Sequence, residues 1–422
     1  MTSSRPFYPV YRTPAGEVGV SRNLRAVGVN GRDLWELDDT HLIPLPDGAD
    51  LLSLPGRPPL ALDPVDGEAV VIEAEDGGPL EALAASLPVG FTRLFLPAAE
   101  DDGRGPLLPL FGYTAVAERG GRLYAAALRT DDPRPWAPRR YDPRTVETLI
   151  AAREKEFPGN RVLAQLARCA RDYHCRTAQN LFYRRGEAGL PAAMTCNASC
   201  LGCISLQPAA CCPSPQSRLS FRPEPWELVD LAVAHLSAGP GRMVSFGQGC
   251  EGEPLTVAPL LAETIRAIRC RTQEGTICLN TNGGLPEALS TLLDAGLDRV
   301  RVSLFSAVPG DYAAYHRPAG YGLTEVENSL RLVGRRASLN LLVFPGFTDA
   351  PRQAEALIGL CRRTGLGQLQ LRNLNIDPRL MTPFLRDADP PGLLSFLADF
   401  RRALPGVAIG NYTRAAVRQP QR

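Results

Sequence analysis

The sequence predicts a mixed α/β fold, in which a β-rich N-terminal domain precedes a parallel sheet built from strand–helix units. Two observations predict this fold. From about residue 190, apolar runs of strand length alternate with amphipathic helical patterns and are joined by short loops. Before residue 140, short apolar runs are separated by Pro and Gly turn signals. Each strand of the second region is expected to cross over right-handedly to a parallel neighbour.

The first 140 residues are expected to form a small β-rich or α+β domain. AVVIEA, RLFLP and RLYAAALR are strand-length apolar runs in this region, and the sequence gives no indication of the domain's role. Apolar residues then recur at three- and four-residue spacing in TVETLIAAREKEF and RVLAQLARCARDYH, a spacing typical of amphipathic helices. Residues 141–189 are therefore predicted to be a helical connector.

Six strand–helix units are predicted after the connector. The expected strands are residues 192–196, 242–247, 275–281, 299–306, 338–344 and 367–374. The expected helices are residues 223–239, 257–270, 285–296, 324–336, 351–365 and 392–404. Periodicity alone fits an open doubly wound sheet as well as an incomplete barrel. In both folds, ligands bind where the strands end and the loops begin.

The composition is that of an ordinary soluble globular protein. Hydrophobic residues make up 44% and charged residues 22% of the 422 residues, and the formal net charge is +1. The region after residue 140 is mildly basic, which fits a solvated surface as well as an anionic cofactor and does not indicate nucleic acid. The chain has neither a signal-peptide pattern nor an apolar run of membrane-spanning length, so we expect a cytoplasmic protein without a membrane partner.

The cysteines are the most informative residues. All 11 lie between Cys169 and Cys361, and a reducing compartment favours metal ligands and buried thiols over disulfides. In MTCNASCLGC, Cys196, Cys200 and Cys203 follow the first predicted strand. Thiolates suit zinc and iron–sulfur clusters, but structural zinc usually takes four ligands from two separate segments. A [4Fe–4S] cluster held by three cysteines would leave one iron open for chemistry.

The cysteine loop and the segments that follow it resemble the radical S-adenosylmethionine (SAM) superfamily. FGQGCEGEP, after the second strand, is similar to that superfamily's Gly-Glu-Pro region, with Glu253 and Pro254 in matching positions. Four later segments also resemble the superfamily. They are NTNGG at its third-strand turn, VSLFS at its fourth-strand pattern, YHRPAGY at its Tyr-x-Arg segment and VFPGFTD at its fifth-strand glycine turn. The resemblance covers about residues 190–377.

The resemblance implies a partial (β/α)6 TIM-like barrel over residues 190–405, followed by a C-terminal tail over residues 406–422. It also implies that Cys196, Cys200 and Cys203 hold a [4Fe–4S] cluster whose open iron binds SAM. Reductive cleavage of SAM would give a 5′-deoxyadenosyl radical that abstracts a hydrogen from the substrate. We therefore expect an oxidoreductase or transferase that acts on a small molecule or a peptide, with flavodoxin or ferredoxin as the electron donor.

The same resemblance implies roles for residues around the loop. Glu253 would accept hydrogen bonds from the SAM ammonium group, and Arg317 would present a bidentate fork to the SAM carboxylate. Ser303 and Ser306 would reach the ribose, and Gly346 would let the chain approach the adenine. Ordinary turn, surface or packing roles are the competing interpretation for this set. The remaining expected cofactor-binding residues are Pro254, Asn280 and Asn282.

Three features depart from the superfamily pattern. Gly202 stands where an aromatic residue is common, and Phe305 stands where Asp is common. Cys250 and Glu251 look like an insertion in the Gly-Glu-Pro region. These departures concern the surroundings of the nucleoside and leave the cysteine loop unchanged.

Polar residues at the end of the sixth strand are expected to face the substrate, with loop capping as the competing interpretation. A barrel presents its binding loops at that end of each strand. The expected substrate residues are Arg372, Asn373, Asn375 and Asp377, all in QLRNLNIDP.

The other cysteines leave alternatives open. A second metal site is one interpretation of Cys169, Cys175, Cys211 and Cys212, and small buried thiols are the other. Two functions compete with the radical SAM enzyme. One is a zinc-stabilised binding module that uses the thiols of the cysteine loop together with His174, Cys211 and Cys212, and the other is a non-catalytic iron–sulfur electron carrier or sensor.

Overall fold

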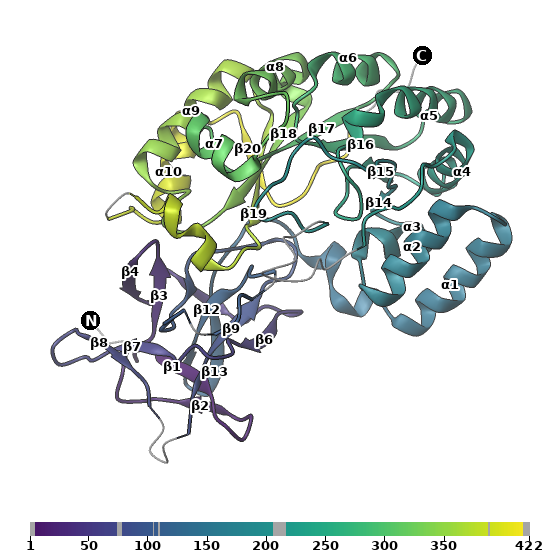
Figure 1. The fold of residues 1–422 in the computed structure, drawn as a ribbon. Helices are drawn as coiled ribbons and strands as arrows, with labels where there is room; N and C mark the ends of the chain where they lie inside the picture. Colours follow the sequence, from purple (N-terminus) through teal and green to yellow (C-terminus); the bar gives the residue numbers. More distant parts are fainter. Residues whose placement is uncertain are drawn as a thin grey trace.

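The computed structural model describes residues 5–73, 78–103, 105–108, 110–205, 217–386 and 389–416. In Figure 1, an antiparallel β-rich N-terminal domain (purple to blue) lies beside a half-barrel of parallel strands that is covered by helices (teal to yellow). The predicted fold class is confirmed, with a β-rich N-terminal region followed by a partial TIM-like barrel. No helix of the described residues is both long enough and apolar enough to cross a membrane.

Short antiparallel strands build the N-terminal domain. Its largest sheet has the order β10-β13-β12-β1-β9-β6, with β2 paired to β1 and β5 paired to β13. Two smaller sheets are β11-β3-β4 and β7-β8. The strands are β1 Tyr8–Arg12, β2 Val18–Val20, β3 Val27–Asn30, β4 Asp33–Glu36, β5 Leu42–Pro44, β6 Asp50–Ser53, β7 Leu60–Leu62, β8 Ala69–Val71, β9 Glu81–Ser86, β10 Phe91–Arg93, β11 Leu96–Pro97, β12 Thr114–Arg119 and β13 Arg122–Arg129.

Three helices, α1 (Pro143–Glu156), α2 (Arg161–Asp172) and α3 (Arg176–Tyr183), connect the domain to the half-barrel. Helix α1 begins after Asp142, whose carboxylate accepts hydrogen bonds from two backbone N–H groups of the first turn. Helix α2 begins after Asn160, whose side chain accepts a hydrogen bond from the Leu163 N–H at 2.9 Å. These caps explain why the helical pattern of the connector starts where it does.

The half-barrel is a seven-stranded parallel sheet in the sequential order β14 to β20. Its six strand–helix units match the predicted alternation, and Figure 1 shows helices α4, α5, α6, α8, α9 and α10 along the outer side of the sheet. The strands are β14 Glu187–Gly189, β15 Met243–Phe246, β16 Thr276–Thr281, β17 Arg299–Leu304, β18 Ala337–Val343, β19 Gln368–Asn373 and β20 Ala408–Gly410. The helices are α4 Pro225–Leu236, α5 Ala258–Arg271, α6 Pro286–Asp294, α7 Pro309–His316, α8 Leu323–Val333, α9 Pro351–Thr364 and α10 Leu393–Ala403.

The first strand of the sheet lies earlier than predicted. It is β14, whereas the expected strand at residues 192–196 is extended chain outside the sheet. The backbone there pairs with a loop instead, because the Gly252 N–H donates to the Ala193 oxygen at 2.8 Å. The sheet also continues into residues 408–410, within the segment expected to be a tail.

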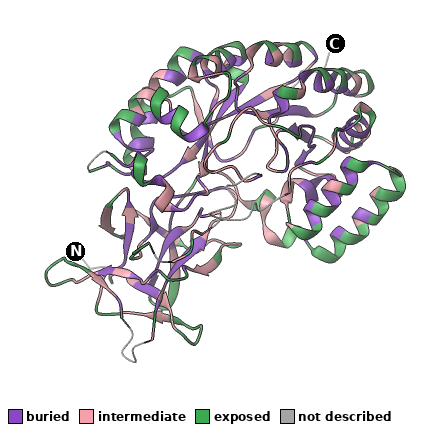
Figure 2. Ribbon diagram, viewed as in Figure 1, coloured by how far each residue is buried: buried purple, intermediate pink, exposed green. Residues whose placement is uncertain are grey.

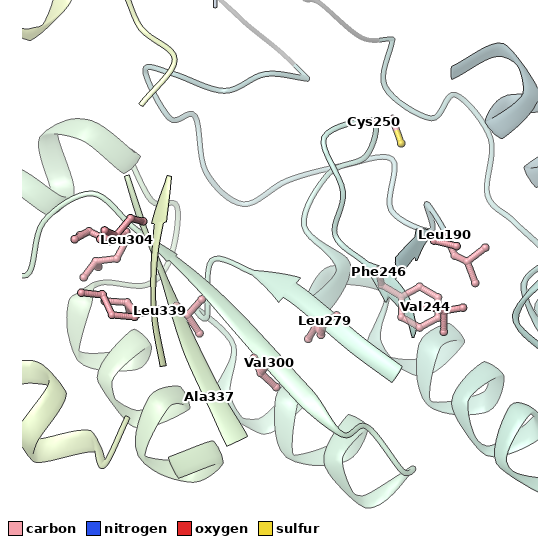
Figure 3. Close-up of a cluster of buried hydrophobic side chains, with 14 of the residues drawn as sticks. Leu190, Val244, Phe246, Cys250, Leu279, Val300, Leu304, Ala337 and Leu339 are labelled. Carbon is pink, nitrogen blue, oxygen red and sulfur yellow. The ribbon is translucent and has the colours of Figure 1, made fainter. Parts of the chain in front are cut away.

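The two faces of the sheet differ in polarity. Phe246, Leu279, Val300 and Ala337 lie in register on four neighbouring strands and are buried in the main core (Figure 3). Figure 2 shows these strands as buried, while green marks the solvent sides of the helices. Full burial of each large apolar side chain stabilises the fold by about 1.5–3 kcal/mol. The inner face instead carries polar residues, including Asn280, Arg301, Ser338 and Gln368 in register.

The N-terminal domain contacts the half-barrel at the carboxyl ends of β18 and β19. Arg93 is completely buried, and its guanidinium donates to the Leu374 oxygen at 2.8 Å, while its backbone N–H donates to the Asn373 Oδ1 at 3.0 Å. A buried ion pair joins Arg57 to Asp377 at 2.6 Å. The N-terminal domain therefore covers part of the edge where binding loops are expected.

Candidate active site

The loop after β14 carries the three cysteines and is held on one side by the segment after β15. The Glu253 N–H donates to the Thr195 oxygen at 2.8 Å, next to the hydrogen bond from the Gly252 N–H to the Ala193 oxygen. A Cβ at Gly252 would come within 1.9 Å of the Thr195 oxygen. Only glycine therefore allows this close approach of the two backbones.

The opposite side of the cysteine loop is held by the end of α7. The Leu201 N–H donates to the Tyr315 oxygen at 3.1 Å, and the Ser199 N–H donates to the His316 oxygen at 3.2 Å. The segment YHRPAGY thus supports the loop through its backbone. These bonds fix the cysteines without a disulfide.

Cys196, Cys200 and Cys203 line one cavity of about 500 Å³ at the carboxyl ends of the barrel strands. Burial, together with the nearby Cys203 and Cys196, raises the pKa of Cys200 to about 12. Burial also raises the pKa of Cys196. Thiols that raise one another's pKa need a cationic partner to ionise, and the iron of a cluster is such a partner. These residues therefore fit an iron–sulfur cluster held by one loop.

His316 is fixed in one tautomer beside Cys200. Its Nε2 accepts a hydrogen bond from the Phe305 N–H at 3.1 Å, so the ring proton lies on Nδ1. Nδ1 is 3.3 Å from the Cys200 Sγ. Burial lowers the pKa of His316 to about 3, and the neutral ring donates a single hydrogen bond to the sulfur.

Glu253 joins the start of the 3-10 helix η3 (Pro254–Val257) to the end of β16. Its Oε1 accepts from the Leu255 N–H at 3.0 Å and from the Thr281 hydroxyl, and its Oε2 accepts from the Asn282 N–H at 2.8 Å. Burial raises the pKa of Glu253 to about 7. Asn282 in turn donates from Nδ2 to the Asn197 Oδ1 in the cysteine loop at 2.7 Å. The expected residues that line the cavity of the cysteines are Glu253, Pro254, Asn280, Asn282, Ser303 and Arg372.

Glu251, which the sequence pattern marked only as part of an insertion, has a defined place in the site. Its carboxylate accepts hydrogen bonds from the N–H groups of Ala192, Ala193 and Gln248 at 2.8, 2.9 and 3.1 Å, and from Gly247. Burial raises the pKa of Glu251 to about 7. The side chain holds the end of β15 against the chain that enters the cysteine loop.

Arg301 and Glu187 are cavity residues that the sequence reasoning missed. They form a buried ion pair across the inner face of the sheet, between β17 and β14. The alternation of polar and apolar residues in RVRVSL could have indicated Arg301, because every second side chain of a strand lies on the same face. Because helices cover the outer face of the sheet, polar residues at alternate strand positions indicate a polar inner face.

The inner face also carries two of the expected cofactor residues and one expected substrate residue. Ser303 lies in register with Asn340, and Asn280 lies in register with Arg301. Arg372, on the next strand, donates from Nε to the Asn340 Oδ1 at 3.2 Å. The structure thus brings these side chains to the cavity of the cysteines.

Ser306, Arg317 and Gly346 are not among the residues that line this cavity. Ser306 donates to the Gln353 Oε1 at 2.6 Å, and Arg317 is an exposed residue in the left-handed region at φ 47°. Gly346 has φ +83°, and a Cβ there would come within 2.0 Å of the Gly31 Cα in the N-terminal domain. Gly346 thus permits contact between domains, and the cofactor roles of the three residues stay predictions.

The remaining expected substrate residues do not line the cavity of the cysteines. Asn373 and Asn375 line a second cavity of about 280 Å³, which Arg372 also lines. Asp377 is buried in its ion pair with Arg57 and lines neither cavity. Its substrate role stays a prediction, while its observed contacts join the two domains.

The other cysteines show no second metal site among the described residues. The thiols of Cys169 and Cys250 form a hydrogen bond with each other, and Cys175 precedes α3. Cys211 and Cys212 lie outside the described residues. Within the described part of the chain, no three His, Cys, Asp or Glu side chains converge on a single metal ion, the arrangement that structural zinc requires. A second site therefore stays a prediction.

Comparison with known proteins gives one family match. Residues 192–357 match the model of the radical SAM superfamily. This range contains the cysteine loop, the segment around Glu253 and strands β15 to β18. No curated protein matches the chain.

Several solved structures are similar to the chain at low identity. A radical SAM methyltransferase from Sphaerobacter thermophilus has 16% identity and a TM-score of 0.37, covering 53% of this chain and 65% of that one. The FeFe-hydrogenase maturase HydG from Carboxydothermus hydrogenoformans has 16% identity and a TM-score of 0.35, covering 63% and 73%. Streptococcus suis SuiB bound to precursor peptide SuiA has 13% identity and a TM-score of 0.39, covering 60% and 54%. The chain thus spans less than two thirds of the methyltransferase and of SuiB, and at TM-scores below 0.5 none of these likenesses bears on its activity.

Proposed function

We propose that this chain is a radical SAM enzyme that cleaves SAM reductively at a [4Fe–4S] cluster, because residues 192–357 match the model of that superfamily. The bound cluster and SAM would supply a 5′-deoxyadenosyl radical that abstracts a hydrogen atom from the substrate. Cys196, Cys200 and Cys203 are the residues that would hold the cluster. The cavity they line would receive both SAM and substrate.

One observation carries the proposal: three thiols of a single loop line the same cavity as the buried carboxylate of Glu253. A structural zinc site would need four ligands around one ion. An electron carrier would have no use for a carboxylate and a row of polar strand residues beside its cluster. A cavity of about 500 Å³ next to the thiols provides the space that a catalytic site needs.

Glu253 would bind the ammonium group of SAM. Its two oxygens accept three hydrogen bonds from the protein, which leaves capacity for one further donor. Arg218 adds a positive charge beside the cluster, because its Nη2 lies 3.9 Å from the Cys203 Sγ and donates to the Ser205 hydroxyl at 3.0 Å.

Product analysis of the anaerobic enzyme tests the proposal. The protein is reconstituted with iron and sulfide, reduced with dithionite and incubated with SAM, and 5′-deoxyadenosine is measured. We expect this product from the wild type and from Cys270→Ser, which changes an exposed cysteine. Replacing any one of Cys196, Cys200 and Cys203 by Ser should abolish the product. A cluster that forms but never yields 5′-deoxyadenosine with any reductant would contradict the proposal.

A further variant asks whether the cluster takes a fourth thiol. Cys175 also lines the cavity, and its Sγ lies 3.2 Å from the Thr177 hydroxyl. Cys175→Ser should keep the wild-type iron content and product yield. Zinc without iron or sulfide in the anaerobically purified protein would instead favour the binding module.

A further inference from the structure

Arg372 lies at the junction of two cavities. It lines the cavity of the cysteines, of about 500 Å³, and the adjoining cavity of about 280 Å³. Strand β19 places it in register with Leu342 of β18, which also lines both cavities. A molecule bound by Arg372 can therefore reach toward the cysteine loop while the rest of it occupies the second cavity.

Arg372 forms no ion pair with a carboxylate of the described residues, although the charges of Glu187 and Asp131 act on it. Its Nε donates to the neutral Asn340 side chain, and no Asp or Glu oxygen of the described residues forms an ion pair with it. Glu187, on the inner face, forms its ion pair with Arg301. Burial and the charge of Arg301 lower the pKa of Arg372 to about 10, which leaves it protonated at neutral pH. Two carboxylates, Glu187 and Asp131, act on Arg372 electrostatically, and neither forms an ion pair with it.

The second cavity has an apolar wall that comes from the N-terminal domain. The loop between β9 and β10 and the start of β10 bring this wall to the carboxyl end of β19. Amide side chains lie around Arg372 on the half-barrel side. The apolar residues are Leu87, Val89 and Phe91, and the amides are Asn373, Asn375 and Asn411.

We propose that the substrate carries a carboxylate group that binds Arg372 and an apolar portion that fills the cavity beside Val89 and Phe91. This inference rests on the proposed function. The planar fork of a guanidinium group matches a carboxylate with two parallel hydrogen bonds. A carboxylate adds one negative charge to a buried site that already holds Glu187 and Asp131, whereas a phosphate dianion would add two.

Binding of matched probes to the reconstituted holoenzyme tests this assignment. The probes are 3-phenylpropionate, 3-phenylpropionamide and 2-phenylethylphosphonate, and their dissociation constants are measured by ligand-detected NMR with the cluster oxidised. We expect the carboxylate to bind about tenfold or more tightly than the amide, as a charge-assisted hydrogen bond provides. Arg372→Gln should remove this difference, and Arg372→Lys should restore part of it. Arg336→Gln, at an exposed position, is the matched control and should keep the wild-type values.

Three results would overturn the inference: no binding of the carboxylate, equal binding of carboxylate and amide, or tightest binding of the phosphonate. The SAM dissociation constant is measured with the same variants and should not change in Arg372→Gln. A large loss of SAM affinity would assign Arg372 to the carboxylate of SAM and would also overturn the inference. None of these measurements requires turnover, so a failure to cleave SAM would count against the proposed function alone.

Discussion

Gly202 lies directly against Tyr315, and a Cβ at position 202 would come within 2.6 Å of the Tyr315 hydroxyl oxygen. Tyr315 is fully buried and stacks on Phe305 with ring centroids 4.2 Å apart, so the ring cannot move aside. The superfamily pattern often has an aromatic residue at the position of Gly202. In this chain, a tyrosine from α7 occupies that side of the cysteine loop instead.

Gly202→Ala should therefore displace the cysteine loop. Overpacking of this kind costs about 1–3 kcal/mol, and we expect a lower free energy of unfolding together with reduced iron content after reconstitution. The double variant Gly202→Ala, Tyr315→Phe removes the clashing oxygen and should recover most of both losses. Gly310→Ala is the control, because a Cβ at Gly310 meets nothing within 4 Å. Equal effects of the alanine at positions 202 and 310 would contradict this packing argument.

The hydrogen bond from His316 to Cys200 should raise the reduction potential of the bound cluster. A hydrogen-bond donor to a ligand sulfur stabilises the negative charge that the cluster gains when it is reduced. His316→Leu should therefore make the potential more negative by on the order of 50 mV, since about 1.4 kcal/mol corresponds to 59 mV for one electron. His316→Gln keeps an amide donor and should shift the potential less. EPR-monitored redox titration measures the potential, and unchanged values in both variants would show that this bond does not tune the cluster.

Binding of SAM should depend on pH through Glu253. Because burial raises the pKa of Glu253 to about 7 from 4.5, the side chain is protonated below pH 7 in the SAM-free enzyme. The carboxylate form binds an ammonium group, so SAM affinity should rise about tenfold per pH unit up to pH 7 and then level off. Equilibrium dialysis of the holoenzyme with SAM between pH 5.5 and 8 measures this slope. A slope that persists in Glu253→Gln would have to come from another group.

His235 should make the fold sensitive to mild acid. It is buried on α4, its Nε2 is 3.1 Å from the Gly186 oxygen, and burial lowers its pKa to about 4 from 6.5. A lowered pKa in the folded state gives stability that is present above pH 6.5 and lost as the pH falls toward 4. At 1.36 kcal/mol per pKa unit, this loss is about 2 kcal/mol between pH 6.5 and pH 5.

Urea unfolding at pH 5 and pH 7 measures the effect of His235. His235→Gln keeps a donor for the Gly186 oxygen but carries no titrating group. Between pH 7 and pH 5, the free energy of unfolding should fall in both proteins, and the fall should be about 2 kcal/mol smaller in the variant than in the wild type. Parallel pH profiles for the two proteins would show that His235 is not the acid-sensitive group.

Local pattern was sufficient to predict most of the half-barrel. Strands such as Thr276–Thr281 and Arg299–Leu304 combine short length with apolar alternate positions, and each precedes an amphipathic helix. The first strand was misplaced because the short apolar run at residues 192–194 is typical of a strand, yet the backbone there pairs with the loop at Gly252. β14, only three residues long and containing a glutamate, gave no comparable signal.

Contacts between distant parts of the chain were not accessible from the sequence. The bond from Arg93 to the Leu374 oxygen joins residues 281 positions apart, and no local pattern encodes it. For the same reason, no local pattern indicated that Gly346 lies against Gly31 of the N-terminal domain. The covering of the cavity by the N-terminal domain therefore emerges only from the folded structure.

EPR spectroscopy of the reduced cluster, with and without SAM, tests the central claim most directly. If one iron lacks a protein ligand, adding SAM to the reduced wild type should change the g values, and Cys175→Ser should show the same change. If the spectrum of the reduced cluster is identical with and without saturating SAM, the three cysteines do not leave an iron open, and the proposed catalysis is contradicted.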